Sequence, residues 1–398
     1  MQAILSGVEA FPTRYTNLEL ARTRFGDRVD RLGRHLTRGD ELADAVVESM
    51  EQLGRVEGWR LFEAGLRAGA GAIPGAPEAM REMLDQAAHV PAWLDWDTCD
   101  RGGTLLLRAG PLGGAVLGAR SLVLGYASPG GNKPLVLSGR LQQQAKRRLD
   151  ETARFVQAVS RPGGMRPYAD GWQITLKVRL IHAQVRRMIL KAGRWNHQAW
   201  GLPVNQHDMA GTTLLFSCSI IDGLRKLGMR IDPDEAERYV HLWRWVGRVI
   251  GVDEDVLPAS EGEGMRLADL IFLTMGDPDD DSRELTRALF ESVYEGCRTP
   301  AERKRAERNV VFGEVVCREL IGDDLADKLG VRRTTLRHAL PMMKRFVRMG
   351  ERVTKAVPFG ERGAVAVGTL YWDRVVEIGL QGATYDFALP TRLGARAA

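Results

Sequence analysis

The sequence is poor in cysteine, with four in 398 residues, and none of them stands in a C-x-x-C or C-x-x-C-H pattern. This excludes covalent attachment of a haem through the usual motif and argues against a structural zinc cluster. We expect Cys99, Cys218, Cys297 and Cys317 to be free thiols in the interior. Cys218 is the alternative candidate for a thiolate ligand, but its sequence context lends that role no support.

Long apolar runs are also missing. No stretch reaches the roughly 18 apolar residues that a membrane-spanning helix requires. The longest candidate, residues 110–125, is rich in glycine and is interrupted by Arg120. The N-terminus lacks the basic segment and apolar core of a secretory signal. We therefore expect a cytoplasmic protein without a transmembrane segment.

The sequence has no concentrated basic tract, although its formal net charge is +5. Basic residues alternate with acidic ones, as in A-E-R-K-R-A-E-R at 301–308. That pattern is typical of solvated helix faces with ion pairs between residues four apart. No nucleic-acid motif accompanies it, so we do not expect nucleic acid as a partner.

Strand-type alternation is scarce, whereas helical periodicity recurs along the chain. We predict an all-α protein with a single large domain over 1–398, a motif-bearing core at about 90–255 and peripheral helices in 1–90 and 256–398. Residues 102–131 are interpreted as glycine-rich turns around a short helix, and the segment after Gly360 fits either a helix or a short strand pair. The predicted helices cover residues 17–36, 41–68, 77–88, 138–160, 172–193, 205–228, 232–251, 265–275, 281–297, 301–320, 323–329 and 334–349.

One histidine stands out in the predicted helix 172–193. Helical spacing places His182 between an apolar stripe and two arginines, Arg179 and Arg186. The stripe consists of Ile174, Val178, Ile181, Val185, Met188 and Ile189. An imidazole between an apolar wall and guanidinium groups suits the proximal side of a flat, anionic, iron-containing cofactor such as haem. The alternative is a core histidine with a satisfied hydrogen bond. His207 lacks metal-ligand spacing and is expected to be structural.

The predicted helix 138–160 carries a charged group in the middle of its apolar face. Arg148 and Thr152 project from that face, and Glu151 lies at its edge. Because arginine cannot lose its charge by deprotonation, a buried Arg148 needs a fixed anionic or multi-acceptor partner. That partner is either an acidic side chain or a carboxylate of a cofactor.

Seven segments between residues 91 and 252 resemble one family in register. They are P-A-W-L-D-W-D (91–97), S-L-V-L-G-Y (121–126), N-K-P-L-V-L-S-G-R-L (132–141), R-x-x-E-T (148–152), K-V-R-L-I-H-A-Q-V-R (177–186), G-L-P-V-N-Q-H-D-M (201–209) and Y-V-H-L-W-R-W-V-G-R-V-I-G-V (239–252). The chain resembles the haem-dependent oxygenases that include the latex-clearing rubber oxygenases and the mpaB-type oxygenases of fungal meroterpenoid biosynthesis.

The resemblance implies a globin-like helical core around a non-covalent haem b, with His182 as the proximal ligand of the iron. It also implies that Arg148 and Thr152 line the cofactor or its distal pocket. We expect the cofactor-binding set to be His182, Arg148, Arg179, Arg186, Thr212 and Phe216, with Arg179 or Arg186 beside a propionate. Ordinary core packing is the alternative for Thr212 and Phe216.

The chain departs from the family pattern at residue 151. Rubber oxygenases carry a lysine in an R-x-x-K-T element, where it can approach the distal side of the iron, and this chain has Glu151. An acidic base expected upstream of that element has no counterpart in S-P-G-G-N-K-P at 128–134. Rubber is therefore not the expected substrate.

Together these observations predict a haem b-dependent oxygenase that acts on a small hydrophobic substrate, lipid-like or terpenoid, with molecular oxygen or peroxide as oxidant. Arg148, Glu151 and Thr152 are the predicted catalytic residues: Glu151 would move protons at the distal face, and Thr152 would donate a hydrogen bond there. The alternatives are a peroxide-using haem enzyme of the same fold, a non-catalytic haem carrier or sensor, and a haem-free helical binding protein.

Overall fold

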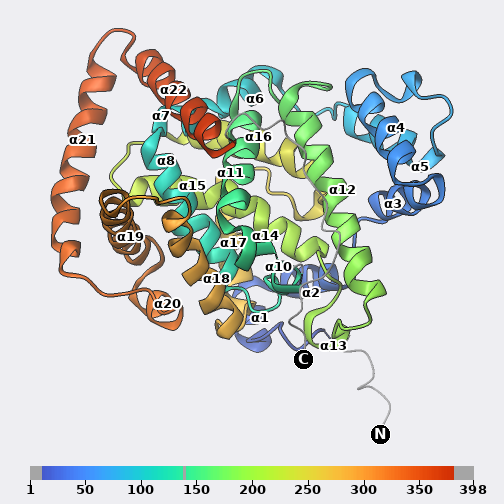
Figure 1. Cartoon of the computed structure of the whole chain (residues 1–398), viewed down its shortest axis with the longest axis horizontal. Coiled ribbons are helices and arrows are strands. Elements are labelled where there is room, and N and C mark those ends of the chain that lie inside the picture. The colour runs from blue at the N-terminus through green and yellow to red at the C-terminus, as the bar shows by residue number, and fades with distance from the viewer. Residues whose placement is uncertain (1–10, 138–139, 381–398) are drawn as a thin grey trace, which may run out of the picture.

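The computed structural model describes the backbone of residues 11–137 and 140–380 and their side chains, except those of 140–144 and 380 (Figure 1). These residues form helices and connecting turns, and their one β-type contact is an isolated bridge between Tyr15 and Met275. The prediction of an all-α protein is therefore confirmed. None of the described helices is both long enough and apolar enough to span a bilayer.

The α-helices follow one another with short connections. In chain order they are α1 (Leu18–Phe25), α2 (Arg28–Arg34), α3 (Glu41–Leu53), α4 (Arg55–Ala68), α5 (Glu78–Ala88), α6 (Trp96–Gly102), α7 (Thr104–Ala109), α8 (Pro111–Val116), α9 (Leu122–Ala127), α10 (Lys133–Leu137), α11 (Arg140–Ser160), α12 (Asp170–Lys191), α13 (His197–Trp200), α14 (Gln206–Phe216), α15 (Cys218–Lys226), α16 (Pro233–Val249), α17 (Glu261–Thr274), α18 (Asp280–Glu291), α19 (Pro300–Ile321), α20 (Asp323–Lys328), α21 (Leu340–Ala356) and α22 (Gly360–Leu380).

Three long predicted helices are each divided in the structure. The helix expected over 17–36 breaks at Gly26, and the one over 41–68 breaks at Gly54, where φ is 61° and 87° respectively. Such positive φ values are accessible to glycine at little cost, and they end a right-handed helix. The helix expected over 205–228 divides at Ser217 into α14 and α15.

Two further segments are more helical than expected. Residues 102–131, interpreted as turns, are mostly helical and comprise α7, α8, a π-helical turn (Leu117–Ser121) and α9. The segment after Gly360 is the helix α22, so the strand-pair alternative is wrong. The indole of Trp372 in α22 is 1% exposed and donates a hydrogen bond to the Leu106 carbonyl at 3.2 Å, which anchors this helix in the core.

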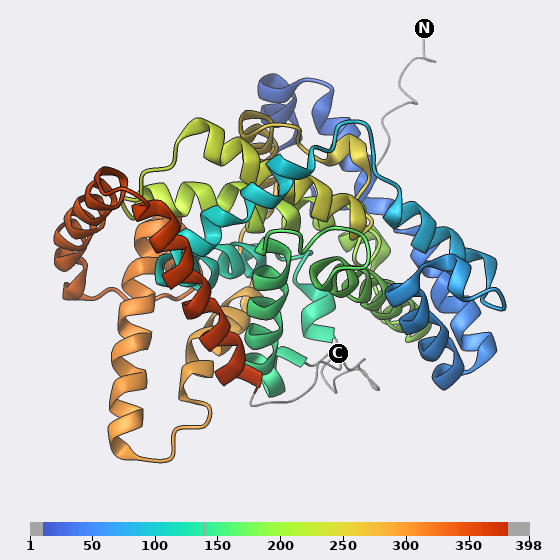
Figure 2. The ribbon, with the colours of Figure 1, turned by 90° about the horizontal axis from the view of Figure 1, so that it is seen from above.

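The helices surround a central layer that contains α11, α12 and α16 (Figures 1 and 2). Helices α3, α4 and α5 lie at one edge of the molecule, and α19 to α21 lie at the opposite edge, from which α22 runs toward the middle to pack against α7 and α11. Helix α12 packs against α11 on one side and against α3 on another. A continuous buried cluster extends from Ala43 in α3 to Trp372 in α22.

Two ion pairs join α12 to the N-terminal end of α3: the pair of Arg179 is buried, and the pair of Arg186 is partly exposed at Asp44. Arg179 donates from Nε and Nη2 to the two carboxylate oxygens of Asp40, at 2.6 and 3.0 Å. About two turns further along, Arg186 donates from Nε to both oxygens of Asp44, each at 2.9 Å. Asp40 also caps α3 by accepting from the Ala43 N–H at 3.2 Å. Because residues 179 and 186 lie on one face of the helix, the pairs fix the rotation of α12.

The Arg179–Asp40 pair leads to a stability prediction. Arg179→Met keeps an unbranched chain but leaves the Asp40 carboxylate, 6% exposed, without its counter-ion. Breaking a buried pair in this way costs about 3–5 kcal/mol, which urea unfolding at neutral pH can measure. In the control, Arg187→Met removes a more exposed pair with Glu51 and should cost less than about 1 kcal/mol. Equal losses of unfolding free energy in the two variants would contradict a stabilising role for the buried Arg179–Asp40 pair.

Candidate functional site

His182 lies on a side of α12 that is partly exposed to solvent. Its Nδ1 is buried, and neither ring nitrogen forms a hydrogen bond with any residue that the structure describes. The described residues thus do not supply the hydrogen bond that the alternative of a core histidine requires. Buried polar atoms almost always have partners, so an orphaned imidazole needs an explanation such as a missing ligand.

Burial lowers the pKa of His182 to about 4, and the nearby positive charges of Arg186 and Arg148 act in the same direction. The imidazole is therefore neutral near pH 7. A neutral ring has a nitrogen lone pair free to bind a metal. Arg186 thus influences this site electrostatically although its own side chain is bound to α3.

The residues around His182 on α12 form an apolar strip with accessible surface. Val178, Ile181 and Val185 are only partly covered, whereas Arg179 and Leu180 on the other faces are buried. Their spacing places these three residues beside His182 along one side of the helix. This side can therefore cover a flat apolar group while presenting an imidazole to it.

Helix α11 contributes Arg148, whose charge lowers the pKa of His182. The Arg148 side chain is half-buried and has no hydrogen bond or ion pair with the described residues. The acidic side chain considered as its partner is thus not found among them. Thr152 donates its hydroxyl to the Arg148 carbonyl at 2.8 Å. Glu151 accepts from Arg147 Nε at 3.1 Å and is therefore not the partner of Arg148.

Tyr126 of α9 is a third polar group near this place, and the sequence analysis did not select it. The side chain is 6% exposed, and its hydroxyl has no hydrogen bond among the described residues. Burial raises the pKa of Tyr126, and the charge of Arg148 opposes that rise. Tyr126 ends the S-L-V-L-G-Y segment, where one phenol at the end of an apolar run was the available signal.

The other two arginines of the predicted cofactor set already have partners. Arg179 is bound to Asp40 and also donates to Gln86 at 3.0 Å. Arg186 is bound to Asp44 and donates to the Val204 carbonyl at 2.7 Å. The structure thus uses both to hold α12 in place, and neither needs a cofactor propionate as counter-ion.

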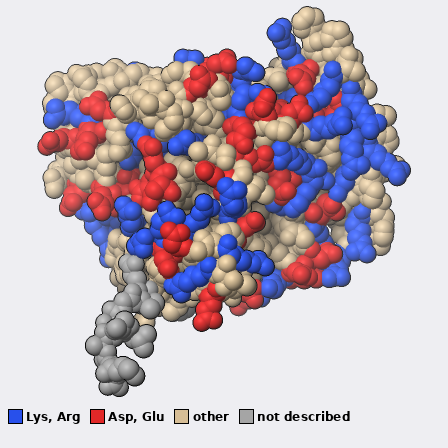
Figure 3. Space-filling model, turned by 180° about the vertical axis from the view of Figure 1, so that it is seen from behind, with Lys and Arg blue, Asp and Glu red and all other residues tan. Residues whose placement is uncertain are grey.

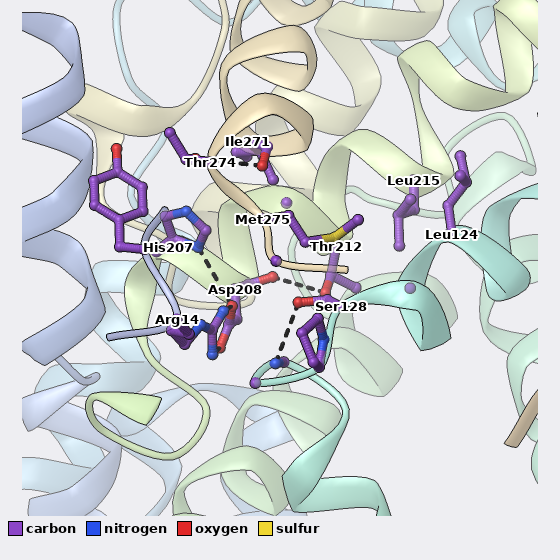
Figure 4. Close-up of a pocket in the computed structure, with 17 residues that line it drawn as sticks. Arg14, Leu124, Ser128, His207, Asp208, Thr212, Leu215, Ile271, Thr274 and Met275 are labelled. Carbon is purple, nitrogen blue, oxygen red and sulfur yellow. Dashed lines mark hydrogen bonds and ion pairs between the residues drawn. The ribbon is translucent and has the colours of Figure 1, made fainter. Parts of the chain in front are cut away.

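Thr212 and Phe216, also predicted to line the cofactor pocket, lie in different surroundings. Phe216 stacks on Trp243, with ring centroids 5.3 Å apart, and meets Phe155 of α11 edge-on. Thr212 is exposed and lines a cavity of about 100 Å³ between α9, α14 and α17 (Figure 4). That volume holds a few water molecules and is too small for a porphyrin, and His182 is not among the residues that line it.

This cavity contains an ion-paired cluster of its own (Figure 4). Arg14 binds the Asp208 carboxylate, and His207 Nδ1 lies 3.3 Å from the same group. Burial alone would raise the pKa of Asp208, but Arg14 and His207 hold it well below its usual range. Asp208 also accepts from the Asn205 side chain at 2.9 Å. The cluster therefore ties the N-terminal segment to the start of α14.

The cysteines belong neither to the surroundings of His182 nor to the cavity that Thr212 lines. All four are free, and Cys99, Cys218 and Cys317 are buried. Burial raises the pKa of Cys218 to about 12. It is therefore a neutral thiol at physiological pH, as is typical of a buried structural cysteine.

Comparison with known proteins links this fold to oxygenases. The family model described as "ER-bound oxygenase mpaB/B'/Rubber oxygenase, catalytic domain" matches residues 107–352. A rubber oxygenase from Streptomyces sp. (strain K30) is 25% identical over 224 residues, which is 56% of this chain and 55% of that protein, so the match spans about half of its length.

A solved structure of latex clearing protein in the closed state resembles the whole fold. Its TM-score is 0.65 at 20% sequence identity, and the match covers 84% of this chain and 91% of that one. At this identity the similarity concerns the fold alone. It extends the likeness well beyond the segment that matches the rubber oxygenase in sequence.

The neutral His182 predicts a specific pH dependence of stability in the cofactor-free protein. Its folded-state pKa of about 4 lies below the ordinary value of 6.5, so the unfolded chain binds the proton first as the pH falls. The contribution of this group to the free energy of unfolding is complete above about pH 6.5 and is lost progressively down to about pH 4. It amounts to about 3 kcal/mol. Urea unfolding across this window should show a smaller loss for His182→Gln than for wild type. The exposed-site control His89→Gln should behave as wild type, and an unchanged pH dependence in His182→Gln would contradict the assignment.

Proposed function

This chain belongs to the family of mpaB-type and rubber oxygenase catalytic domains, and from that premise we propose that it is a haem b-dependent oxygenase that acts on a small hydrophobic substrate. His182 is the proposed iron ligand. When bound, the haem supplies the iron at which oxygen chemistry takes place.

The observation that carries this proposal is the pairing of two unsatisfied groups on neighbouring helices. His182 of α12 presents a neutral imidazole without a hydrogen bond, and Arg148 of α11 presents a cation without a counter-ion among the described residues. Two unrelated ligands would be needed to satisfy them separately. A haem offers a metal for the imidazole and carboxylates for the guanidinium, and its apolar ring suits the strip of Val178, Ile181 and Val185.

The remaining groups of α11 have proposed roles at the distal side. The Glu151 carboxylate, 18% exposed and bound to Arg147, would hold or release a proton there. The Thr152 hydroxyl now donates to a helix carbonyl and would turn to a polar group of a ligand. Arg148 would hold a propionate or a polar distal ligand through charge-assisted hydrogen bonds.

The proposed substrate class follows from the apolar character of the side chains beside His182. The apolar side chains of α12 beside His182 offer few polar contacts, which favours a lipid-like or terpenoid molecule. Glu151 stands where rubber oxygenases have a lysine, so the charge at the distal side differs from theirs. We therefore propose a small substrate rather than rubber, with molecular oxygen or peroxide as oxidant.

An absorption spectrum tests the cofactor and its ligand together. Wild-type protein reconstituted with haem should show a Soret band, and cyanide should shift that band because an oxygenase keeps one iron position open. His182→Ala should lose or strongly alter the band, whereas the exposed-site control His89→Ala should match wild type. A wild-type band without a cyanide shift would indicate a carrier or sensor. The absence of any band would refute the haem assignment.

Arg148 should contribute to cofactor affinity. A charge-assisted hydrogen bond contributes about 1.5–3 kcal/mol, so Arg148→Gln should raise the dissociation constant for haem about tenfold to a hundredfold. The matched control is Arg154→Gln on the same helix, since Arg154 is bound to Asp170 at 2.6 Å. Fluorescence quenching during haem titration measures both constants. An unchanged affinity in Arg148→Gln would exclude Arg148 as the anion-binding group.

A further inference from the structure

Helix α21 has two apolar faces, and one of them faces solvent. Leu340 and Val347 pack toward the core of the molecule. On the opposite side, four large apolar residues are each more than half exposed: Met342 at 59%, Phe346 at 58%, Met349 at 56% and Val353 at 57%. Their spacing of four, three and four residues places them in one stripe, about 16 Å long. We call this set the outer stripe.

The turn after α21 continues the outer stripe. Phe359 is 75% exposed and has a φ of 62°, a conformation that is unfavourable for a bulky residue. Such strain persists where the surrounding structure enforces it, and it is concentrated at functional sites. Val367 and Leu370 of α22 are also exposed, at 69% and 68%. The hairpin thus exposes a patch of large side chains, a feature that marks an interaction surface.

Basic residues accompany the outer stripe on one flank. Helix α21 carries Lys344, Arg345, Arg348, Arg352 and Lys355, against one acid, Glu351. Glu351 is bound to Arg108 of α7 at 2.6 Å, and Lys344 and Lys355 are bound to Glu319 and Asp232. In Figure 3, Lys and Arg atoms gather on the side of the molecule that α21 occupies.

Three cations of this flank are left for an outside partner. Arg345, Arg348 and Arg352 are exposed, and none of them has an ion pair among the described residues. A partner that binds this face must therefore offer both an apolar region and negative charge. A second copy of the chain would bring the same arginines toward one another, which is unfavourable.

We propose that the α21–α22 hairpin binds the surface of an anionic lipid bilayer. The outer stripe and Phe359 enter the boundary between headgroups and acyl chains, and the arginine flank contacts the phosphate groups. An apolar face combined with a basic polar face is the pattern of helices that lie in a membrane interface. The inference is independent of the proposed haem chemistry, and it would bring the protein to the place where lipid-like substrates are dissolved.

Co-sedimentation of the full-length protein with vesicles tests this proposal. The protein should bind vesicles of phosphatidylcholine mixed with phosphatidylglycerol, should bind pure phosphatidylcholine much more weakly, and should be released as salt is raised. At about 1 kcal/mol for each basic residue near the surface, reversing Arg345, Arg348 and Arg352 to Glu should lower the partition coefficient about a hundredfold or more. Phe346→Ser with Met349→Ser should lower it at least about tenfold.

Matched controls come from exposed positions of α19. Reversing Lys304, Arg305 and Arg308 to Glu changes the net charge equally at exposed sites, and Phe312→Ser removes an aromatic side chain that is 49% exposed. Both controls should retain a clear majority of wild-type binding. All the altered side chains are exposed, and thermal melting followed by circular dichroism verifies that each variant is folded.

Three outcomes would overturn the proposal. Wild-type protein could remain in the supernatant with both kinds of vesicle at low salt. The α21 variants could bind as tightly as wild type, which would place the binding surface elsewhere. Analytical ultracentrifugation could show a wild-type dimer that Phe346→Ser with Met349→Ser dissociates, which would assign the outer stripe to a second copy.

Discussion

The rotation of α12 is the constraint on which the site depends. Two ion pairs, the buried one of Arg179 with Asp40 and the partly exposed one of Arg186 with Asp44, attach one face of this helix to α3. An α-helix is rigid, so fixing residues 179 and 186 also fixes where residue 182 points. The imidazole is held next to the apolar strip, within the electrostatic reach of Arg148 on α11 and of Asp40 at the start of α3. Arg179 and Arg186 thus position α12, and His182 is left as a neutral imidazole.

The main site residues could be predicted because each depends on local periodicity. Helical spacing alone placed His182 on a boundary and Arg148 on an apolar face, and the structure shows both without protein partners among the described residues. The carboxylates that bind Arg179 and Arg186 were missed because they are 139 and 142 residues away in sequence. No pattern in a single sequence identifies contacts at such separation. The role expected for those two arginines at a cofactor rim was therefore replaced by a structural one.

The all-α class of the fold could be predicted from the sequence, but the positions at which individual helices end could not. Periodicity extends across Gly26 and Gly54, and only tertiary packing decides that the chain turns there. The opposite error occurred at 102–131, where glycines that suggested turns lie inside helices because close packing favours small residues. For example, a Cβ at Gly102 in α6 would lie 2.3 Å from the Arg238 carbonyl oxygen. Tyr126 was overlooked for the same reason, since its segment was not interpreted as a helix facing the site.

The central claim is a bond between His182 and the iron of a haem, and a crystal structure of the cofactor-loaded protein tests it most directly. The account predicts that a ring nitrogen of His182 coordinates the iron and that the Arg148 guanidinium lies beside an anionic group of the cofactor or a distal ligand. An iron bound by any other side chain, or a His182 enclosed by protein atoms with no cofactor beside it, would contradict the claim.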